Sequence, residues 1–281
     1  MLHLRTIEET RTACPGLPGP LALVPTMGAL HEGHRALVHS AREVAGPGGS
    51  VLVSIFVNPL QFDRPVDLAA YPRVLEADLA ICVELGVDGA FFPEPAEFFE
   101  SDHSLTVHES LLSKHLCGAT RPGHFDGVCT VVLKLFEGIR PDHAFFGKKD
   151  YQQLAIIRRM VRDLALPVEV HGVETVREAD GLALSSRILN LTPEHRADAP
   201  RIRRALLAAR DLSVTGEARP DQYLNTARHH LQDGAPPGFE IDYLELVDRQ
   251  TLQPLSTVNT PALLATAVFY GEVRLIDNIE I

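Results

Sequence analysis

The run Val51–Val57, which reads VLVSIFV, constrains the fold of this chain more than any other segment. It carries no charge and is rich in β-branched residues. It is also apolar enough to be buried on both faces of a sheet, as is typical of a central strand in a parallel sheet. A parallel sheet needs helices on both of its faces, so this run predicts an α/β fold.

The first 170 residues alternate between short apolar runs and segments with helical spacing. Because short connections link strand to helix to strand, this order predicts right-handed βαβ units and a Rossmann-like, doubly wound parallel sheet. Besides Val51–Val57, the expected strands are Leu21–Pro25, Ala90–Phe92, Ala144–Phe146 and Val168–Val170. The expected helices are Ala29–Val44, Leu75–Leu85, Val128–Ile139 and Tyr151–Leu164.

The pattern changes after about Val176. Two helical segments come first, and three strands with hairpin spacing follow, which predicts a smaller C-terminal α+β domain. The expected helices are Pro193–Leu212 and Asp221–Gln232, and the expected strands are Ile241–Val247, Leu263–Phe269 and Val273–Ile276. We therefore expect one domain over residues 1–175 and a second over residues 176–281.

Charge and composition narrow the class of function. The chain of 281 residues has a formal net charge of −11, which argues against binding to nucleic acid or to an anionic membrane. It has no apolar stretch of the length that a transmembrane helix needs, and its first twelve residues lack the apolar run of a secretory signal. The 4 cysteines show no metal-ligand spacing, which is typical of free thiols in a reducing compartment. We expect a cytoplasmic protein.

The segment Pro25–His34 (PTMGALHEGH) lies where a strand gives way to a helix. Free backbone N–H groups and the helix dipole would surround an anion there, and Gly28 would allow close approach of a phosphate. His31 and His34 are three residues apart, so they share one face of the first turn and could stabilise charge on a phosphoryl group. The spacing alone also allows capping histidines, or a zinc site that would need a third ligand.

A second polar segment, Asn58–Phe62, directly follows the central strand. Ligands of open α/β sheets bind beyond the carboxyl ends of the strands, and Gln61 is an amide in that position. A simple turn would explain Asn58 and Pro59 but not Gln61. The nearby acids Glu76 and Asp78 are either surface residues or part of a magnesium site.

The segment Phe145–Gln153 (FFGKKDYQQ) is a third transition from strand to helix. Lys148 and Lys149 oppose the dipole at the start of a helix, which is unfavourable unless an anion neutralises them. Asp150 has a simpler interpretation as a helix cap, and Gln153 is expected to face the same crevice as Gln61.

The fourth segment is Val176–Arg187 (VREADGLALSSR). Asp180-Gly181 marks a turn, while Ser185, Ser186 and Arg187 offer two hydroxyls and a fork-shaped cation that suit a polyphosphate. An interdomain linker with a solvated arginine is the alternative.

Taken together, these segments resemble the pantothenate synthetase (pantoate–β-alanine ligase) family, within the superfamily of nucleotidyltransferases that carry H-x-G-H-type signatures. The resemblance runs from about residue 20 to residue 278. The matching text also includes YPR (71–73), RPGHFDGV (121–128), IDYLELVD (241–248) and GEVRLIDN (271–278).

The resemblance implies an ATP-dependent ligase. Pantoate would attack the α-phosphate of ATP, and β-alanine would then attack the pantoyl-adenylate, giving pantothenate, AMP and pyrophosphate. It also implies a need for Mg²⁺ and a homodimer. We expect the C-terminal domain to close over the ATP site, because excluding water would protect the adenylate from hydrolysis.

The resemblance assigns site residues position by position. His34 would act as the catalytic acid, with His31 beside it and with Lys149 and Arg187 as cations, while Gln61 and Gln153 would bind pantoate. The positions implied to bind ATP are Met27, Gly28, Ala29, Leu30, His31, Glu32, Gly33, His34, Gly147, Lys148, Lys149, Asp150, Val176, Leu184, Ser185, Ser186 and Arg187.

Two positions depart from the family pattern: Lys148 stands where the family has an acid, and Ile188 where it favours asparagine. The residues themselves leave two other functions open. A cytidylyl- or adenylyltransferase would need a basic acceptor pocket in place of Gln61 and Gln153. A nucleotide-sensing module would have no need of His34, Lys149 and Arg187.

Overall fold

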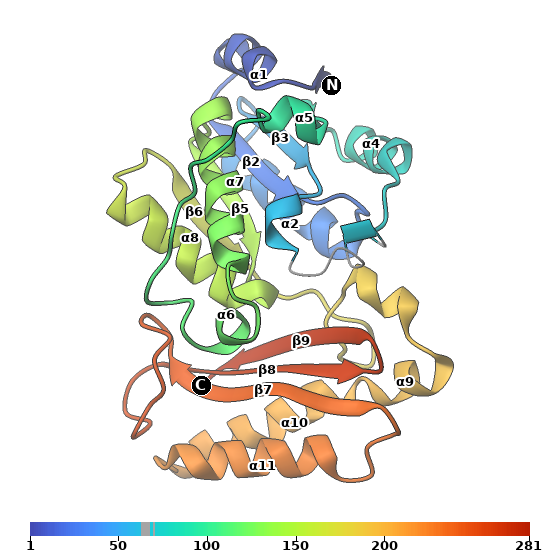
Figure 1. Ribbon diagram of the computed structural model, residues 1–281, viewed down its shortest axis with the longest axis vertical. Helices are drawn as coiled ribbons and strands as arrows, with labels where there is room; N and C mark the ends of the chain where they lie inside the picture. The colour runs from blue at the N-terminus through green and yellow to red at the C-terminus, as the bar shows by residue number, and fades with distance from the viewer. Residues whose placement is uncertain (63–67, 70) are drawn as a thin grey trace. The chain divides into compact units, whose positions relative to one another are not determined.

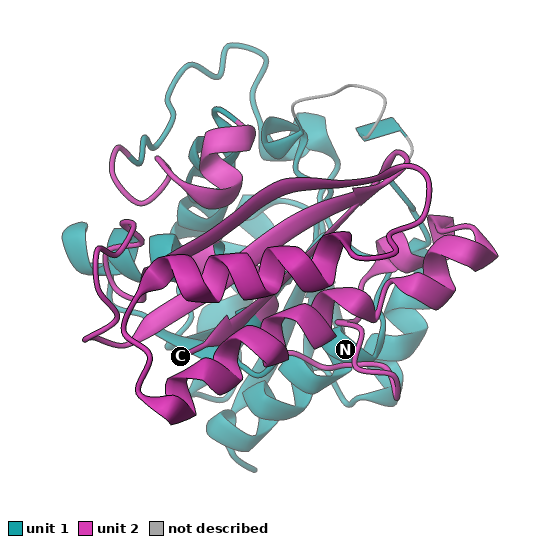
Figure 2. Ribbon diagram, turned by 90° about the horizontal axis from the view of Figure 1, so that it is seen from below, with its two compact units in different colours: residues 1–109, 122–148, 153–174 teal, residues 110–121, 149–152, 175–281 magenta. Residues whose placement is uncertain are grey.

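The computed structural model describes residues 1–62, 68–69 and 71–281 of the chain. They form two compact units, coloured separately in Figure 2. Unit 1 comprises Met1–Glu109, Pro122–Lys148 and Gln153–Glu174. Unit 2 comprises Ser110–Arg121, Lys149–Gln152 and Thr175–Ile281.

Unit 1 contains a parallel sheet of six strands in the order β1-β4-β3-β2-β5-β6 (Figure 1). From β2 the chain builds outward through β3 and β4, then returns to β2 and continues on its other side with β5 and β6. This doubly wound order confirms the predicted fold class. The strands are β1 (Leu2–Leu4), β2 (Leu21–Thr26), β3 (Ser50–Ile55), β4 (Gly89–Phe91), β5 (His143–Gly147) and β6 (Glu169–Val173).

The central strand β3 is buried along its whole length, as the VLVSIFV run predicts. Helix α2 (Glu32–Ala45) places Leu37, Val38 and Ala41 against one face of the sheet, and α4 (Leu75–Glu84) adds Cys82 to the same core. Helix α8 (Tyr151–Asp163) covers the other face. It approaches β6 so closely that a Cβ on Gly172 would lie 2.7 Å from the Leu154 side chain.

Unit 1 also contains elements that were not predicted from the sequence. The first are β1 and α1 (Ile7–Ala13), which are too short to show a hydrophobic period. Thr6 and Glu9 form a capping box at the start of α1, a sequence signal that could have revealed it. Helix α7 (His124–Ile139) begins four residues earlier than predicted, and the short α5 covers Pro95–Phe98.

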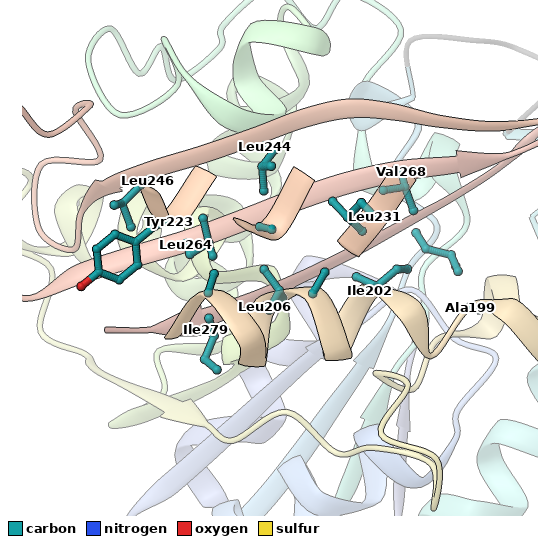
Figure 3. Close-up of a cluster of buried hydrophobic side chains, with 14 of the residues drawn as sticks. Ala199, Ile202, Leu206, Tyr223, Leu231, Leu244, Leu246, Leu264, Val268 and Ile279 are labelled. Carbon is teal, nitrogen blue, oxygen red and sulfur yellow. The ribbon is translucent and has the colours of Figure 1, made fainter. Parts of the chain in front are cut away.

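Unit 2 is built on an antiparallel sheet of β7 (Phe239–Asp248), β8 (Ala262–Tyr270) and β9 (Val273–Glu280). Helices α10 (Arg201–Arg210) and α11 (Pro220–Gln232) bury their apolar stripes against it. Figure 3 shows Ile202, Leu206 and Leu231 of these helices directed toward Leu264 and Val268 of β8. The short helix α6 (Leu116–Thr120) packs on β7 and β8.

The predicted single helix Pro193–Leu212 is wrong, because two helices occupy this segment. Helix α9 covers Pro193–Asp198 and α10 begins at Arg201, with Pro200 at the N-cap position between them. A proline lacks the N–H that a helix interior needs, so the break has a direct cause in the sequence. Among the described residues, no helix combines the length and the apolar character that crossing a membrane requires.

Candidate active site

The sheet order of unit 1 places two of the four motif segments at neighbouring strand ends. Strands β2 and β5 pair in parallel, with Leu23 opposite Ala144. Their carboxyl ends therefore lie at the same edge of the sheet, where the strand order reverses, and ligands of doubly wound folds bind at that point. The loop of residues 27–31 follows β2, and Lys148 directly follows β5.

The loop after β2 is held by a buried carboxylate. Asp78 on α4 is 1% exposed, and its two oxygens accept the backbone N–H groups of Ala29 at 2.9 Å and Leu30 at 2.7 Å. Gly28 has a φ of +81°, and a Cβ there would lie 2.8 Å from the Asp78 Oδ2 atom. Glycine is therefore required at residue 28 both by its backbone conformation and by the close approach of Asp78.

The loop ends at a pair of histidines. The imidazole of His31 caps α2, because its Nδ1 accepts the N–H of Gly33 at 3.1 Å. The Nδ1 of His34 in turn accepts the N–H of His31 at 3.2 Å. The two ring centroids are 4.2 Å apart, which confirms that both side chains share one face of the first turn.

This capping geometry determines which ring nitrogen carries the proton. In each ring Nδ1 is an acceptor, so a neutral imidazole here has its proton on Nε2. Both rings therefore have an Nε2–H donor at the positive end of the α2 dipole. The pair suits the stabilisation of a developing negative charge by hydrogen bonds.

The backbone of this loop does not match the expectation of free N–H groups around an anion. The N–H of Gly28 donates to Thr26 Oγ1 at 3.2 Å, and those of Ala29 and Leu30 are bound to Asp78. The N–H groups of His31 and Gly33 are taken by the two imidazoles. Side chains, rather than these five backbone groups, are therefore the donors that this turn offers.

Gln61 lies in the short 3-10 helix η2 (Pro59–Gln61) and is oriented by its neighbours. Its Oε1 accepts from the Nδ2 of Asn58 at 3.1 Å, and its Nε2 donates to the Met27 sulfur at 2.8 Å. Asn58 is 2% exposed and also donates to the carbonyl of Gly127 at 3.1 Å. Asn58 thus joins Gln61 to α7, a role beyond the simple turn that the sequence allows.

The close approach of α7 to η2 explains why residue 127, in the HFDG part of the RPGHFDGV motif, is a glycine. A Cβ at this position would lie 2.3 Å from the carbonyl oxygen of Leu60, so only glycine lets α7 approach η2. The ring of His124, one turn earlier on α7, hydrogen-bonds the Gln61 carbonyl at 2.8 Å.

Lys148 follows Gly147 at the end of β5 and forms an ion pair with Glu174, just beyond β6. Glu174 therefore supplies a negative charge beside the lysine that departs from the family pattern. The Glu174 side chain is 82% exposed, so this pair is solvated and weak. Gln153 lies in the first turn of α8 and is half-buried.

In unit 2, strand β9 fixes three of the segments that contain predicted site residues. The Nδ2 of Asn278 donates to the carbonyl of Lys149 at 2.9 Å. The carboxylate of Asp277 accepts two hydrogen bonds from Arg177, at 2.7 and 2.9 Å. The carbonyl of Arg274 lies 3.5 Å from a guanidinium nitrogen of Arg187. One strand therefore holds segments that lie far apart in the sequence.

The fourth motif is a small hairpin followed by a 3-10 turn. The N–H of Leu184 donates to the carbonyl of Val176 at 3.0 Å, and Gly181 has a φ of +91° at the tip. Ser185 then caps η4 (Ser186–Asn190) by accepting the N–H of Arg187 at 3.2 Å.

Lys149, from the third motif, also lies in unit 2. Its Nζ is 3.8 Å from a carboxylate oxygen of Asp150.

The predicted list lacks three residues that shape these segments: Asn58, Asp78 and Asn278. Each acts on a part of the chain that is distant in sequence or through a buried contact. The sequence gives a signal for Asn58, which begins the segment Asn58–Phe62, and for Asn278, which stands in the matched GEVRLIDN text.

A comparison with known families decides between the functions that the sequence leaves open. The model of the pantoate-beta-alanine ligase family matches residues 3–280. The chain belongs to the pantoate–β-alanine ligase family. The predicted family and the predicted class of enzyme are thereby confirmed.

Individual members of the pantoate–β-alanine ligase family are similar to the chain over nearly its whole length. The pantothenate synthetase of Akkermansia muciniphila is 55% identical over 261 residues, which cover 93% of this chain and 92% of the relative. That of Desulfovibrio desulfuricans is 51% identical over 259 residues, covering 92% of this chain and 90% of the relative.

Solved structures of the family share the fold. Pantothenate synthetase from Thermus thermophilus is 47% identical, with a TM-score of 0.92 and 99% of each chain covered. The pantoate-beta-alanine ligase from Francisella tularensis, in complex with beta-gamma ATP and beta-alanine, is 33% identical with a TM-score of 0.80. That match covers 99% of this chain and 97% of the Francisella chain.

Proposed function

We propose that the chain catalyses the ATP-dependent condensation of pantoate with β-alanine, giving pantothenate, AMP and pyrophosphate through a pantoyl-adenylate. Membership of the ligase family supports the reaction, and the Francisella relative with bound ATP and β-alanine supports two of the substrates. The single structural observation that carries the proposal is the pair of imidazoles that caps α2.

In the first step a carboxylate oxygen of pantoate attacks the α-phosphorus of ATP. The new P–O bond forms as the bond to the β-phosphate oxygen breaks, and pyrophosphate leaves. Negative charge grows on the α-phosphate oxygens, so donors placed there lower the barrier. We assign this role to the Nε2–H groups of His31 and His34. The fixed Nδ1 acceptors favour His34 as a neutral donor over His34 as an acid.

Gln61 and Gln153 are proposed to hold pantoate. A neutral amide can bind a hydroxyl or a carboxylate without adding negative charge beside the attacking oxygen. Asn58 and Met27 fix the Gln61 side chain before substrate arrives, which reduces the entropy that binding would otherwise cost.

Cations for the phosphates are proposed to come from Lys149 and Arg187. The backbone carbonyl of Lys149 and the guanidinium group of Arg187 both contact strand β9, which holds the two segments in place. The other positions proposed to contact ATP in these loops are Gly147, Lys148, Asp150, Val176, Leu184, Ser185 and Ser186. Those proposed in the loop after β2 are Met27, Gly28, Ala29, Leu30, Glu32 and Gly33.

In the second step the β-alanine nitrogen attacks the acyl carbon of the adenylate. The C–N bond forms, the C–O bond to AMP breaks, and the amine loses a proton to solvent. Water would attack the same carbon, so the bound adenylate must be kept from solvent.

Mg²⁺, a homodimer and a cytoplasmic location are further parts of the proposal. Asp78 does not fit a magnesium ligand well, because both of its oxygens already accept N–H groups. We propose that Mg²⁺ instead arrives on the phosphates of ATP, where it neutralises charge. The four free, buried cysteines support a reducing compartment, and the family resemblance alone supports the homodimer.

The decisive experiment measures exchange of labelled pyrophosphate into ATP in the presence of Mg²⁺. Exchange that requires pantoate but not β-alanine supports the adenylate, and adding β-alanine should then release AMP and pyrophosphate in equal amounts. Formation of ADP, or turnover without pantoate, would overturn the proposal. The variant His229→Ala, on the surface of α11, serves as a matched histidine control that should keep full activity.

A further inference from the structure

A cluster of two histidines and a glutamate lies on β5 and β6, apart from every residue assigned above. His143 begins β5, and Glu169 and His171 lie on β6, with Glu169 directly opposite His143 in the register. Residues two apart on a strand share a face, so all three side chains project from the same face of the sheet. Within residues 1–62, 68–69 and 71–281, this is the one group of three or more such side chains with metal-binding spacing.

The distances between the candidate ligand atoms match a small tetrahedral site. The Nδ1 of His143 lies 3.1 Å from the Nε2 of His171 and 3.6 Å from a carboxylate oxygen of Glu169. The Nε2 of His171 lies 3.8 Å from the other oxygen of Glu169. Tetrahedral Zn²⁺, with bonds of about 2.0–2.1 Å, would hold its ligand atoms roughly 3.3 Å apart. Small side-chain movements are therefore enough to bind the ion.

The surroundings hold the imidazoles in place and leave the site reachable. The ring of His171 stacks on Phe145, with centroids 4.7 Å apart and an interplanar angle of 11°. The side chains of His143 and His171 are 21% and 25% exposed, while that of Glu169 is 68% exposed. An ion can thus enter from solvent, and water can occupy the fourth position.

The charge balance also suits a divalent cation. The exposed carboxylate of Glu169 supplies a negative charge beside the two imidazoles, and neutral imidazole is the form that binds metal. The positive charge of the nearby Arg158 disfavours a bound metal ion, and the negative charge of the Glu169 carboxylate offsets that effect.

We propose that His143, Glu169 and His171 form a Zn²⁺ site that joins the edge strand β6 to β5. The two-histidine, one-carboxylate set is typical of zinc and other late divalent transition metals. β6 pairs only with β5 within the six-stranded sheet (Figure 1), so an ion that bridges the two strands stabilises that edge. The site lies at the amino end of β5. The strand ends at Gly147, roughly 13 Å from His143 at about 3.3 Å per residue, and Lys148 follows it.

Zinc binding should be measured on the full chain after treatment with a chelator, by competition with a chromogenic zinc indicator. We expect one Zn²⁺ per chain and a melting temperature that rises by several degrees at saturating Zn²⁺. His171→Ala should weaken binding at least about a hundredfold, because loss of even an outer-shell partner costs up to that much. Glu169→Gln should weaken binding less than His171→Ala and should reduce the thermal shift correspondingly less.

Two matched variants separate this site from other histidine pairs. His34→Ala removes one ring of the catalytic pair, and the double variant His229→Ala, His230→Ala removes the adjacent pair on α11. Both should keep Zn²⁺ binding at the His143 cluster. Zn²⁺ binding that survives in His171→Ala but is lost in His34→Ala would overturn the proposal. Absence of Zn²⁺ binding to the parent chain would also overturn it, and His143 and His171 would then form only a hydrogen bond between two imidazoles. If His171→Ala does not fold, Glu169→Gln at the exposed position decides the question alone.

Discussion

The carboxylate of Asp78 occupies the space that a side chain at Gly28 would need, since a Cβ on Gly28 would lie 2.8 Å from Asp78 Oδ2. The same carboxylate accepts the N–H groups of the next two residues. A buried acid on α4 therefore sets the path of the loop that carries the histidine pair. The loop and the acid are about 50 residues apart in sequence. Each of them can be tested by its own substitution.

Gly28→Ala should reduce both stability and turnover. An alanine with φ near +81° is strained by about 1–2 kcal/mol, and its methyl group would displace the Asp78 carboxylate. We expect a loss of about 2 kcal/mol in the free energy of unfolding by urea and a large fall in kcat. Asp78→Asn should act in the same direction, because its amide NH₂ would face one of the two N–H groups and leave it unsatisfied. Glu76→Gln, at an exposed position of the same helix, should change neither quantity.

His34→Gln should retain more activity than His34→Ala. If the imidazole acts as a neutral Nε2–H donor, the amide NH₂ of glutamine can replace part of its function. Removal of the donor in His34→Ala should cost about 10²–10³ in the rate of pyrophosphate exchange. Equal loss in the two variants would instead indicate that an imidazolium acid is required.

Asp277→Ala should strongly destabilise unit 2. Asp277 is 3% exposed and its partner Arg177 is 19% exposed, so the single variant would leave a largely buried cation unpaired. Breaking such a pair costs about 3 kcal/mol, measurable by urea unfolding. The double variant Arg177→Met, Asp277→Leu should be less destabilised than the sum of the single changes. Additive losses would show that the two residues act independently.

Stability should depend on pH through Asp198. Burial acts to raise the pKa of this carboxyl, but hydrogen bonds from Arg201 and Tyr270, with the charge of Arg201, outweigh it and lower the pKa. Because the pKa of Asp198 is lowered in the folded state, the ionised carboxylate stabilises the fold at every pH above the pKa of the unfolded state, which is near 3.8. That stability is lost as the pH falls through the lowered pKa.

Asp198→Asn should therefore lower the free energy of unfolding by about 2 kcal/mol at pH 7. The difference from the parent chain should shrink progressively as the pH is lowered from 5 to 3. Glu194→Gln, at an exposed position on the same helix α9, is the control and should show no such convergence.

Features with a local cause were predictable from the sequence. The buried strand β3 and the shared face of His31 and His34 follow from hydrophobic period and residue spacing, which act within a few residues. The break at Pro200 also has a local signal, since proline interrupts a helix interior, although the apolar spacing on both sides of Pro200 is typical of one continuous helix.

Features that depend on tertiary contacts were not predictable. In the sequence Asp78 cannot be distinguished from an acid on the surface of a helix. Its role depends on its contact with the loop of residues 27–31, which only the folded chain brings close. The partner of Lys148, Glu174, is 26 residues away, so nothing local distinguishes an ion pair from a phosphate ligand. The domain boundary between residues 175 and 176, and closure of the C-terminal domain over ATP, stay predictions.

The anchoring of distant segments by β9 has a kinetic consequence for folding. Its three contacts, to Lys149, Arg177 and Arg187, span 129, 100 and 87 residues of sequence. Contacts of such long range form late, because the entropy of closing a large loop must be overcome before they contribute. During refolding from denaturant, nucleotide binding should therefore recover more slowly than helix content. A chain that has regained most of its secondary structure would still be inactive until β9 contacts the segments that carry Lys149, Arg177 and Arg187.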